Sequence, residues 1–331
     1  RGGVSASDRP LFMVRTSDPA PDASGQGAPK RYWRERTYDQ YTGIGWETSP
    51  VERATFDSGR IWKEVGYPRQ LLNQTYTLFE DRQLALNVNE PVVVDHHYTV
   101  LSRGAGDLAA LAVGGSTYVV TSQVPDATVE ELRRAEAAYS DWLAARYLAL
   151  PEVPRRVRIM AERVVERAGA TTRYDKARAI EEYLRGLTYD VDVPPPPGNA
   201  DVVEYLLFTA RRGYCDYSAT AMVVMLRSVG VAARYASGYG QGTYDVEQGA
   251  WVVTGKNAHA WAEVYFPGYG WIEFEPTPSQ GVFSRADTRP VAAPTPVATE
   301  SIAPQPTVSA PRDSAPEPQP LDSIHTWSRN G

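Results

Sequence analysis

Residues 213–231 read GYCDYSATAMVVMLRSVGV and include Cys215, the single cysteine among the 331 residues of the chain. Apolar residues recur at spacings of three and four from Ala219 to Val229, which predicts a helix that buries one face and ends at Gly230. Cys215 therefore lies where a loop enters a helix. The unpaired N–H groups and the positive end of the helix dipole at such a position favour an ionised thiol and can bind an oxyanion.

A lone cysteine beside an apolar helix is more often a buried apolar residue than a nucleophile, so its partners decide between the two. Downstream, residues 259–266 read HAWAEVYF, a PGYG turn follows, and residues 271–278 read WIEFEPTP. Both stretches are rich in aromatic residues and are typical of two short strands joined by a turn. The order cysteine, histidine, carboxylate is that of a triad in which the histidine moves the proton and the acid orients the imidazole ring.

Two stretches, GYCDYSATAMVVMLRSVGVAARYASGYG at 213–240 and NAHAWAEVYFPGYGWIEFEPTP at 257–278, resemble the bacterial transglutaminase-like superfamily, within the papain-like cysteine enzymes. The resemblance implies that Cys215 is the nucleophile, His259 the base and Glu275 the third member. Aspartate is more typical at the position of Glu275. Because glutamate is one methylene longer, we expect it to adopt a different rotamer or to lie further from the histidine.

The two expected strands provide a test that does not depend on the resemblance. Side chains alternate between faces, so His259 and Glu275 share a face of an antiparallel pair only if opposed residue numbers have an even sum. A four-residue loop at 267–270 would pair residue 266 with residue 271, which gives an odd sum. We therefore predict an odd-length loop or a bulge at this turn.

The chain as a whole is predicted to be α+β, with a transglutaminase-like core behind an N-terminal all-β domain. The expected parts are a flexible segment at 1–30, the β domain at 31–125, the catalytic core at 126–285 and a Pro/Ala-rich linker or stalk at 286–331. Strands are expected at 31–38, 74–79, 91–101 and 116–124, and residues 41–46 are expected to form a turn into the next strand. Helices are expected from the Thr128–Glu131 capping box to about 150, at 157–168 and at 177–187.

Residues near the triad carry further expectations. The backbone N–H of Cys215 is one expected oxyanion donor, and a second remains open between the side chains of Tyr189 and Tyr214. Asp216 is expected to turn outward or to cap the helix, because a carboxylate aimed at the sulfur would raise the pKa of the thiol. Arg234, in the strand after the helix, is expected to brace the fold.

Composition excludes several classes of function. A net charge of −6 gives no reason to expect a nucleic-acid partner, and one cysteine excludes an internal disulfide. No calcium-loop or zinc spacing is present, and adjacent His96 and His97 would point to opposite faces of a strand, so no cofactor or metal is assigned. No apolar run approaches the length of a membrane span.

The stretch RTYDQYTGIGW at 36–46 also resembles the β module of membrane-anchored bacterial members of the family. This resemblance implies a domain on the extracytoplasmic face of a bacterial cell membrane, which contacts the membrane only through segments outside this chain. The expected activity is acyl transfer from a protein or peptide substrate through a Cys215 thioester, with an amine or water as acceptor. A cysteine protease or amidase with the same triad, and a non-catalytic peptide- or glycan-binding module, remain alternatives.

Overall fold

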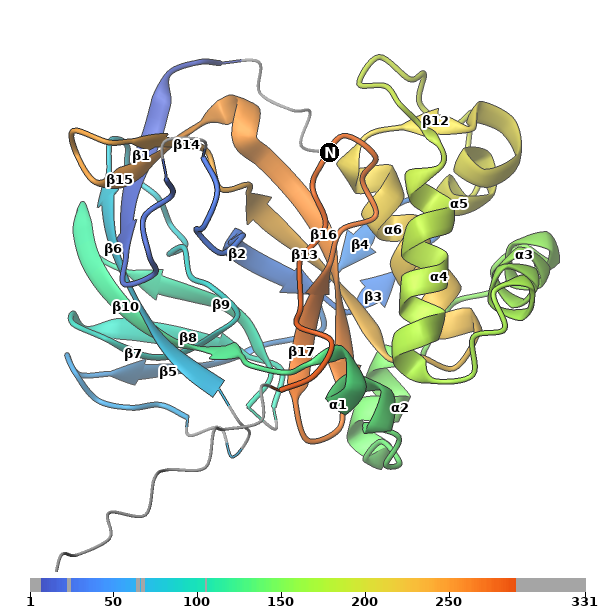
Figure 1. Ribbon diagram of the computed structural model, residues 1–331, viewed down its shortest axis with the longest axis horizontal. Coiled ribbons are helices and arrows are strands. Elements are labelled where there is room, and N and C mark those ends of the chain that lie inside the picture. Colours follow the sequence, from blue (N-terminus) through green and yellow to red (C-terminus); the bar gives the residue numbers. More distant parts are fainter. Residues whose placement is uncertain (1–6, 23–24, 64–65, 67–68, 105, 290–331) are drawn as a thin grey trace, which may run out of the picture. The chain divides into compact units, whose positions relative to one another are not determined.

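Two large antiparallel sheets and a group of helices make up the computed structural model, which describes residues 7–22, 25–63, 66, 69–104 and 106–289 (Figure 1). The chain up to Arg289 forms one compact unit. The predicted linker from residue 286 lies almost entirely outside the described residues. The mixed helix and sheet content, with strands predominating in the N-terminal part, confirms the predicted α+β class.

The six-stranded sheet has the order β14 (Thr243–Asp245), β15 (Ala250–Thr254), β1 (Pro10–Thr16), β6 (Arg69–Leu78), β10 (Thr117–Pro125) and β7 (Glu90–Val94). The seven-stranded sheet has the order β17 (Gly270–Phe274), β16 (Ala258–Phe266), β13 (Ala233–Tyr239), β2 (Trp33–Tyr38), β9 (Leu108–Val113), β8 (Tyr98–Ser102) and β5 (Glu52–Phe56). Both sheets therefore combine strands from either side of the predicted boundary at residue 125. That boundary runs through shared sheets and does not lie between two separately packed units.

The remaining elements are short strand pairs and helices. β3 (Gln40–Tyr41) pairs with β4 (Trp46–Glu47), and β11 (Thr188–Tyr189) pairs in parallel with β12 (Arg212–Gly213). The helices are α1 (Val129–Arg134), α2 (Asp141–Tyr147), α3 (Arg155–Arg167), α4 (Arg173–Arg185), α5 (Val202–Tyr205), the π-helical turn η1 (Leu206–Ala210), α6 (Cys215–Ser228) and the 3-10 turn η2 (Gly255–Asn257).

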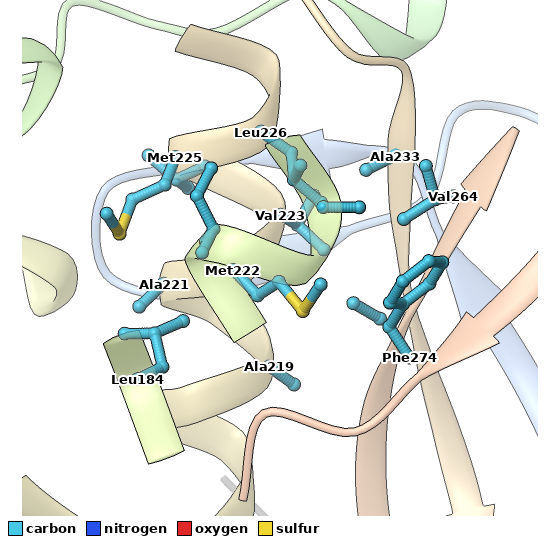
Figure 2. Close-up of a cluster of buried hydrophobic side chains, with 14 of the residues drawn as sticks. Leu184, Ala219, Ala221, Met222, Val223, Met225, Leu226, Ala233, Val264 and Phe274 are labelled. Carbon is cyan, nitrogen blue, oxygen red and sulfur yellow. The ribbon is translucent and has the colours of Figure 1, made fainter. Parts of the chain in front are cut away.

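Helix α6 is the centre of the larger apolar core. Figure 2 shows Ala221 on the side of α6 near Leu184 of α4, whereas Leu226 lies toward Ala233 and Val264 of the sheet. Almost every residue of α6 is buried, so the helix is enclosed on all sides and not on one face as its periodicity predicted. Burying one valine, leucine or methionine side chain contributes about 1.5–3 kcal/mol to the free energy of unfolding. Because α6 buries many such side chains, its position is fixed, and so is that of Cys215 at its start.

Strands β16 and β17 have the register that the triad requires. Phe266 pairs with Gly270 and Glu263 with Glu273, so opposed residue numbers have an even sum and three residues form the loop. The prediction of an odd-length loop is confirmed. Along β16, alanines at 260 and 262 face the core around α6, whereas Trp261 and Glu263 lie on the other face.

Several element predictions need correction. The segment 1–30 was expected to be flexible, but Pro10–Thr16 forms β1 between β6 and β15, because Phe12 and Val14 alternate into the second apolar core. The expected strand at 91–101 is two strands, β7 and β8, which belong to different sheets. The expected helix from Thr128 to about 150 is also split: the predicted capping box starts α1, but Ser140 caps a second helix, α2, by accepting from the Leu143 N–H.

A chain of buried charges joins the seven-stranded sheet to the neighbouring loops. Arg234 on β13 donates from Nε to Glu263 Oε2 at 2.7 Å and from Nη1 to Asp107 Oδ1 at 2.7 Å. Arg34 on β2 donates from Nη1 to Glu263 Oε1 at 2.9 Å, and Arg103 donates from Nε to Asp107 Oδ2 at 2.8 Å. All five side chains are buried, so each charge depends on its partners. The bracing role predicted for Arg234 agrees with these bonds.

Replacement of Arg234 by methionine should therefore destabilise the fold strongly. The variant leaves Glu263 and Asp107 short of a buried partner, which costs about 3–5 kcal/mol in the free energy of unfolding. Arg134→Met is the matched control, because Arg134 pairs with Glu130 at the exposed surface of α1, where loss of a pair costs about 1 kcal/mol or less. Urea unfolding followed by circular dichroism measures both, and equal losses in the two variants would contradict the prediction.

Candidate active site

Cys215 is the first residue of α6, as the sequence predicted. The preceding Gly213 has no room for a side chain, because an added Cβ would lie 3.0 Å from Cβ of Tyr217 and 3.2 Å from Cδ1 of Leu206. The N-cap residue, Tyr214, makes no side-chain capping bond. The first-turn N–H groups of α6 therefore have no side-chain cap of their own, which suits stabilisation of an oxyanion beside the thiol.

His259 and Glu275 are in direct contact. His259 Nε2 donates to Glu275 Oε2 at 2.6 Å, and both side chains are buried. The extra methylene of glutamate therefore does not separate the carboxylate from the ring, so of the two expectations for Glu275 the greater distance is not observed. Because Nε2 is bonded to the carboxylate, Nδ1 is the ring nitrogen left to exchange a proton with a thiol.

The N-terminal segment supplies further contacts to the same carboxylate. The Tyr32 hydroxyl donates to Glu275 Oε2, and Lys30 Nζ lies 4.0 Å from that oxygen. The ring of Tyr32 also packs against the imidazole of His259, with ring centroids 4.8 Å apart. Glu275 Oε1 accepts from the backbone N–H of Thr277 at 2.7 Å. Four groups thus surround a carboxylate that is completely buried.

Helix α4 holds the backbone of Glu275. The N–H of Glu275 donates to Glu181 Oε1 at 2.7 Å, and Arg185 Nη1 donates to the carbonyl oxygen of Glu275 at 3.0 Å. Sequence reasoning did not find Lys30, Tyr32, Glu181 or Arg185. The periodicity of α4 predicts its buried apolar residues, but no local pattern indicates that polar side chains so far away in sequence meet residue 275.

These contacts determine the ionisation of the carboxylate. Burial opposes ionisation of Glu275, but the charge and hydrogen bond of His259, with Lys30 and Thr277, outweigh it and lower the pKa of Glu275 below its ordinary value. Glu275 is therefore ionised at neutral pH. A negative charge at this position fixes the ring orientation of His259.

The surroundings of the Cys215 thiol favour its neutral form, whereas those of Glu275 favour the charged form. Burial raises the pKa of Cys215 to about 12, and the Asp216 carboxylate adds to this effect. Asp216 Oδ1 lies 4.0 Å from Sγ and accepts from the Tyr235 hydroxyl at 2.9 Å. The prediction that Asp216 turns outward or caps the helix is wrong, because the buried Tyr235 hydroxyl on β13 holds the carboxylate beside the sulfur. The resting thiol is therefore protonated at neutral pH.

A cavity of about 360 Å³ connects the candidate residues. Cys215 and His259 both line it, together with Tyr189 and the glycine-rich end of β13. Of the two residues proposed as side-chain oxyanion donors, Tyr189 lies on the cavity wall, whereas the ring of Tyr214 packs against Tyr217 with centroids 5.1 Å apart. The geometry favours Tyr189 as the candidate donor.

Two further histidines, His96 and His97, lie within the part of the chain that the structure describes. His96 contacts Asp95, and His97 contacts Asp57, each at the exposed surface. Among the described residues, no three histidine, cysteine, aspartate or glutamate side chains are placed to hold a metal ion. In the same part of the chain, no helix has the length and apolar character needed to span a bilayer.

Replacement of Asp216 by asparagine should make the thiol more acidic. The amide keeps an acceptor for Tyr235 but removes the negative charge that raises the pKa of Cys215. The pH midpoint of Cys215 alkylation by iodoacetamide should fall by about one unit, so the rate at pH 7 should rise about tenfold. Asp81→Asn, at an exposed position after β6, is the control. A midpoint that stays constant or rises in Asp216→Asn would show that this carboxylate does not act on the sulfur.

Comparisons with known proteins bear on the fold of this region. The sequence model of the Transglutaminase-like superfamily matches residues 160–276, a range that contains Cys215, His259 and Glu275. The crystal structure of the periplasmic domain of TgpA from Pseudomonas aeruginosa superimposes with a TM-score of 0.62 at 24% identity, covering 82% of this chain and 89% of that one. This likeness establishes a shared fold.

Two curated proteins are similar in sequence. YebA of Bacillus subtilis (strain 168), described as uncharacterized, is 31% identical over 87% of this chain, and a protein-glutamine gamma-glutamyltransferase of Pseudomonas aeruginosa is 39% identical over 25% of it. The matches span 43% and 12% of those two proteins, so the chain corresponds to less than half the length of either relative. Residues 160–276 therefore match the Transglutaminase-like superfamily, and the chain is similar to bacterial transglutaminase-like proteins.

Proposed function

We propose that this protein is an acyl transferase in which Cys215, His259 and Glu275 act as nucleophile, base and orienting acid. The single observation that supports the assignment most is the 2.6 Å contact between His259 Nε2 and a buried, ionised Glu275, beside a cavity that the thiol also lines. A buried histidine–carboxylate pair is costly to maintain in a folded protein, and its position next to the only cysteine gives it a chemical use.

The proposed reaction begins with the protonated thiol. As Sγ attacks the carbonyl carbon of a carboxamide or peptide bond, its proton passes to Nδ1 of His259, and Glu275 stabilises the resulting imidazolium. The developing oxyanion is placed at the N-terminus of α6, near the backbone N–H of Cys215, with the Tyr189 hydroxyl as candidate second donor. The carbon–nitrogen bond then breaks, and the amine leaves with the proton from His259. The product of this half-reaction is an acyl thioester on Cys215.

The second half-reaction reverses these steps. His259 takes a proton from an incoming amine or water, which attacks the thioester and restores the thiol. An amine gives a new amide, and water gives a carboxylic acid. Similarity to a protein named protein-glutamine gamma-glutamyltransferase favours a glutamine side chain as the acyl donor. Similarity of fold to a periplasmic domain supports a location outside the cytoplasmic membrane.

Incubation of the protein with a glutamine-containing peptide library and a primary amine should reveal the reaction by mass spectrometry. Acyl transfer adds the amine with loss of ammonia, hydrolysis converts the amide to an acid, and proteolysis shortens the peptide. We expect amine incorporation or deamidation, and Cys215→Ala should abolish it while the fold persists. Cleaved peptides would favour the protease alternative. Turnover that survives in Cys215→Ala would reject the mechanism, and no reaction with any peptide would favour a binding module.

Glu275→Gln should reduce kcat by about 10²-fold, because the amide no longer stabilises the imidazolium form of His259. The loss should be smaller than that in Cys215→Ala, since the thiol and the ring remain. Glu273→Gln, two residues earlier on β17, is the matched control: Glu273 accepts from Asn89 at 2.9 Å and does not contact His259. Equal rates for Glu275→Gln and the wild-type protein would remove Glu275 from the mechanism.

A further inference from the structure

The charged side chains on the wall of the cavity beside Cys215 are all basic. Their sign indicates which class of substrate the proposed function would use. The charged or titratable wall groups, apart from the thiol and tyrosine hydroxyls, are the ammonium groups of Lys30 and Lys256 and the imidazole of His259. The remaining lining residues are neutral, and none of the lining residues is an aspartate or a glutamate. Glu275 lies behind the wall and is fully buried. A ligand that enters the cavity therefore meets positively charged side chains on its wall, and no carboxylate belongs to the wall itself.

Lys30 is held in a fixed position at this wall. Its Nζ lies 4.6 Å from the ring centroid of Tyr32 and 5.0 Å from that of Phe283, and it donates to the carbonyl oxygen of Gly281. Burial lowers the pKa of Lys30 to about 8, although the nearby Glu275 charge opposes the shift. The ammonium form therefore prevails at pH 7. About one-fifth of the side chain remains exposed, on the cavity side of a carboxylate already bonded to His259 and Tyr32.

Lys256 is the more accessible of the two. It lies in η2, directly before β16, and its side chain is 53% exposed. Its partner, Asp8, is 81% exposed at a distance of 2.7 Å. Such an exposed pair contributes about 1 kcal/mol or less, so a carboxylate on a bound ligand can replace Asp8 at little cost. The two lysines come from segments more than 200 residues apart in sequence, yet they border one cavity.

We propose that this cavity selects acyl donors that carry a carboxylate close to the reacting carboxamide, with Lys256 and Lys30 as the groups that recognise it. An acidic peptide is the substrate class that fits. The inference rests on the proposed function, because the bound peptide is an acyl donor only if its carboxamide lies at Cys215. The recognition itself is a binding property, and it can be measured without turnover.

Binding of matched peptides to the Cys215→Ala protein provides the test. The peptides are acetylated, contain one glutamine, and differ only in having aspartate or serine at each position flanking it. Isothermal titration calorimetry should show at least one aspartate peptide binding about three- to tenfold more tightly than its serine counterpart, as expected for one partly exposed ion pair. The difference should shrink between about 20 mM and 500 mM salt, because screening weakens exposed charge pairs.

Variants identify the groups responsible. Lys256→Met and Lys30→Met, each combined with Cys215→Ala, should reduce the preference for aspartate, and Lys256→Arg should retain it. Lys176→Met on α4, where the ammonium contacts the carbonyl oxygen of Val229, is the control and should also retain it. Serine peptides that bind as well as aspartate peptides, or a preference that survives in both methionine variants, would overturn the inference. Failure of the active protein to turn over any peptide would reject the proposed function alone, because these affinities are measured without the thiol.

Discussion

The buried Glu275 carboxylate is the constraint on which the candidate site depends. A carboxylate without access to water must be compensated by several donors, and here they come from distant parts of the chain. His259 belongs to β16, Tyr32 precedes β2, Thr277 follows β17, and Glu181 of α4 binds the backbone N–H of Glu275. The carboxylate of Glu275 therefore links the N-terminal segment to the sheet and orients the imidazole, and its backbone N–H adds the link to helix α4.

The electrostatic contrast between thiol and carboxylate has a mechanistic meaning. The surroundings of Glu275 favour its charged form, whereas burial and Asp216 favour the neutral form of Cys215. The sulfur therefore rests as a neutral thiol. In the proposed mechanism the proton moves as the substrate is attacked, which keeps the sulfur unreactive toward other electrophiles until a carbonyl group is in place.

The sequence predicted the structure correctly where helical spacing or the alternation of side chains along strands determines it. The apolar spacing after Cys215 predicted α6, and alternation of side chains predicted the odd-length loop that brings His259 and Glu275 to one face. It was not informative about contacts between distant segments. No local pattern indicates that Tyr32 meets Glu275 or that Tyr235 draws Asp216 toward the sulfur. The split between α1 and α2 was missed because a cap at Ser140 interrupts an otherwise continuous helical pattern.

Because β2 lies at the centre of the seven-stranded sheet, the transglutaminase-like segment does not complete its own sheet. Residues 160–276, the part that matches the superfamily, include β13 but not its neighbour β2, and they lack Arg34 and Asp107, which neutralise Glu263 and Arg234. Excised alone, this segment would present β13 as a bare sheet edge beside unpaired charges, a combination that promotes self-association. In this protein, residues 160–276 therefore depend on the N-terminal strands that complete their sheet and neutralise its buried charges.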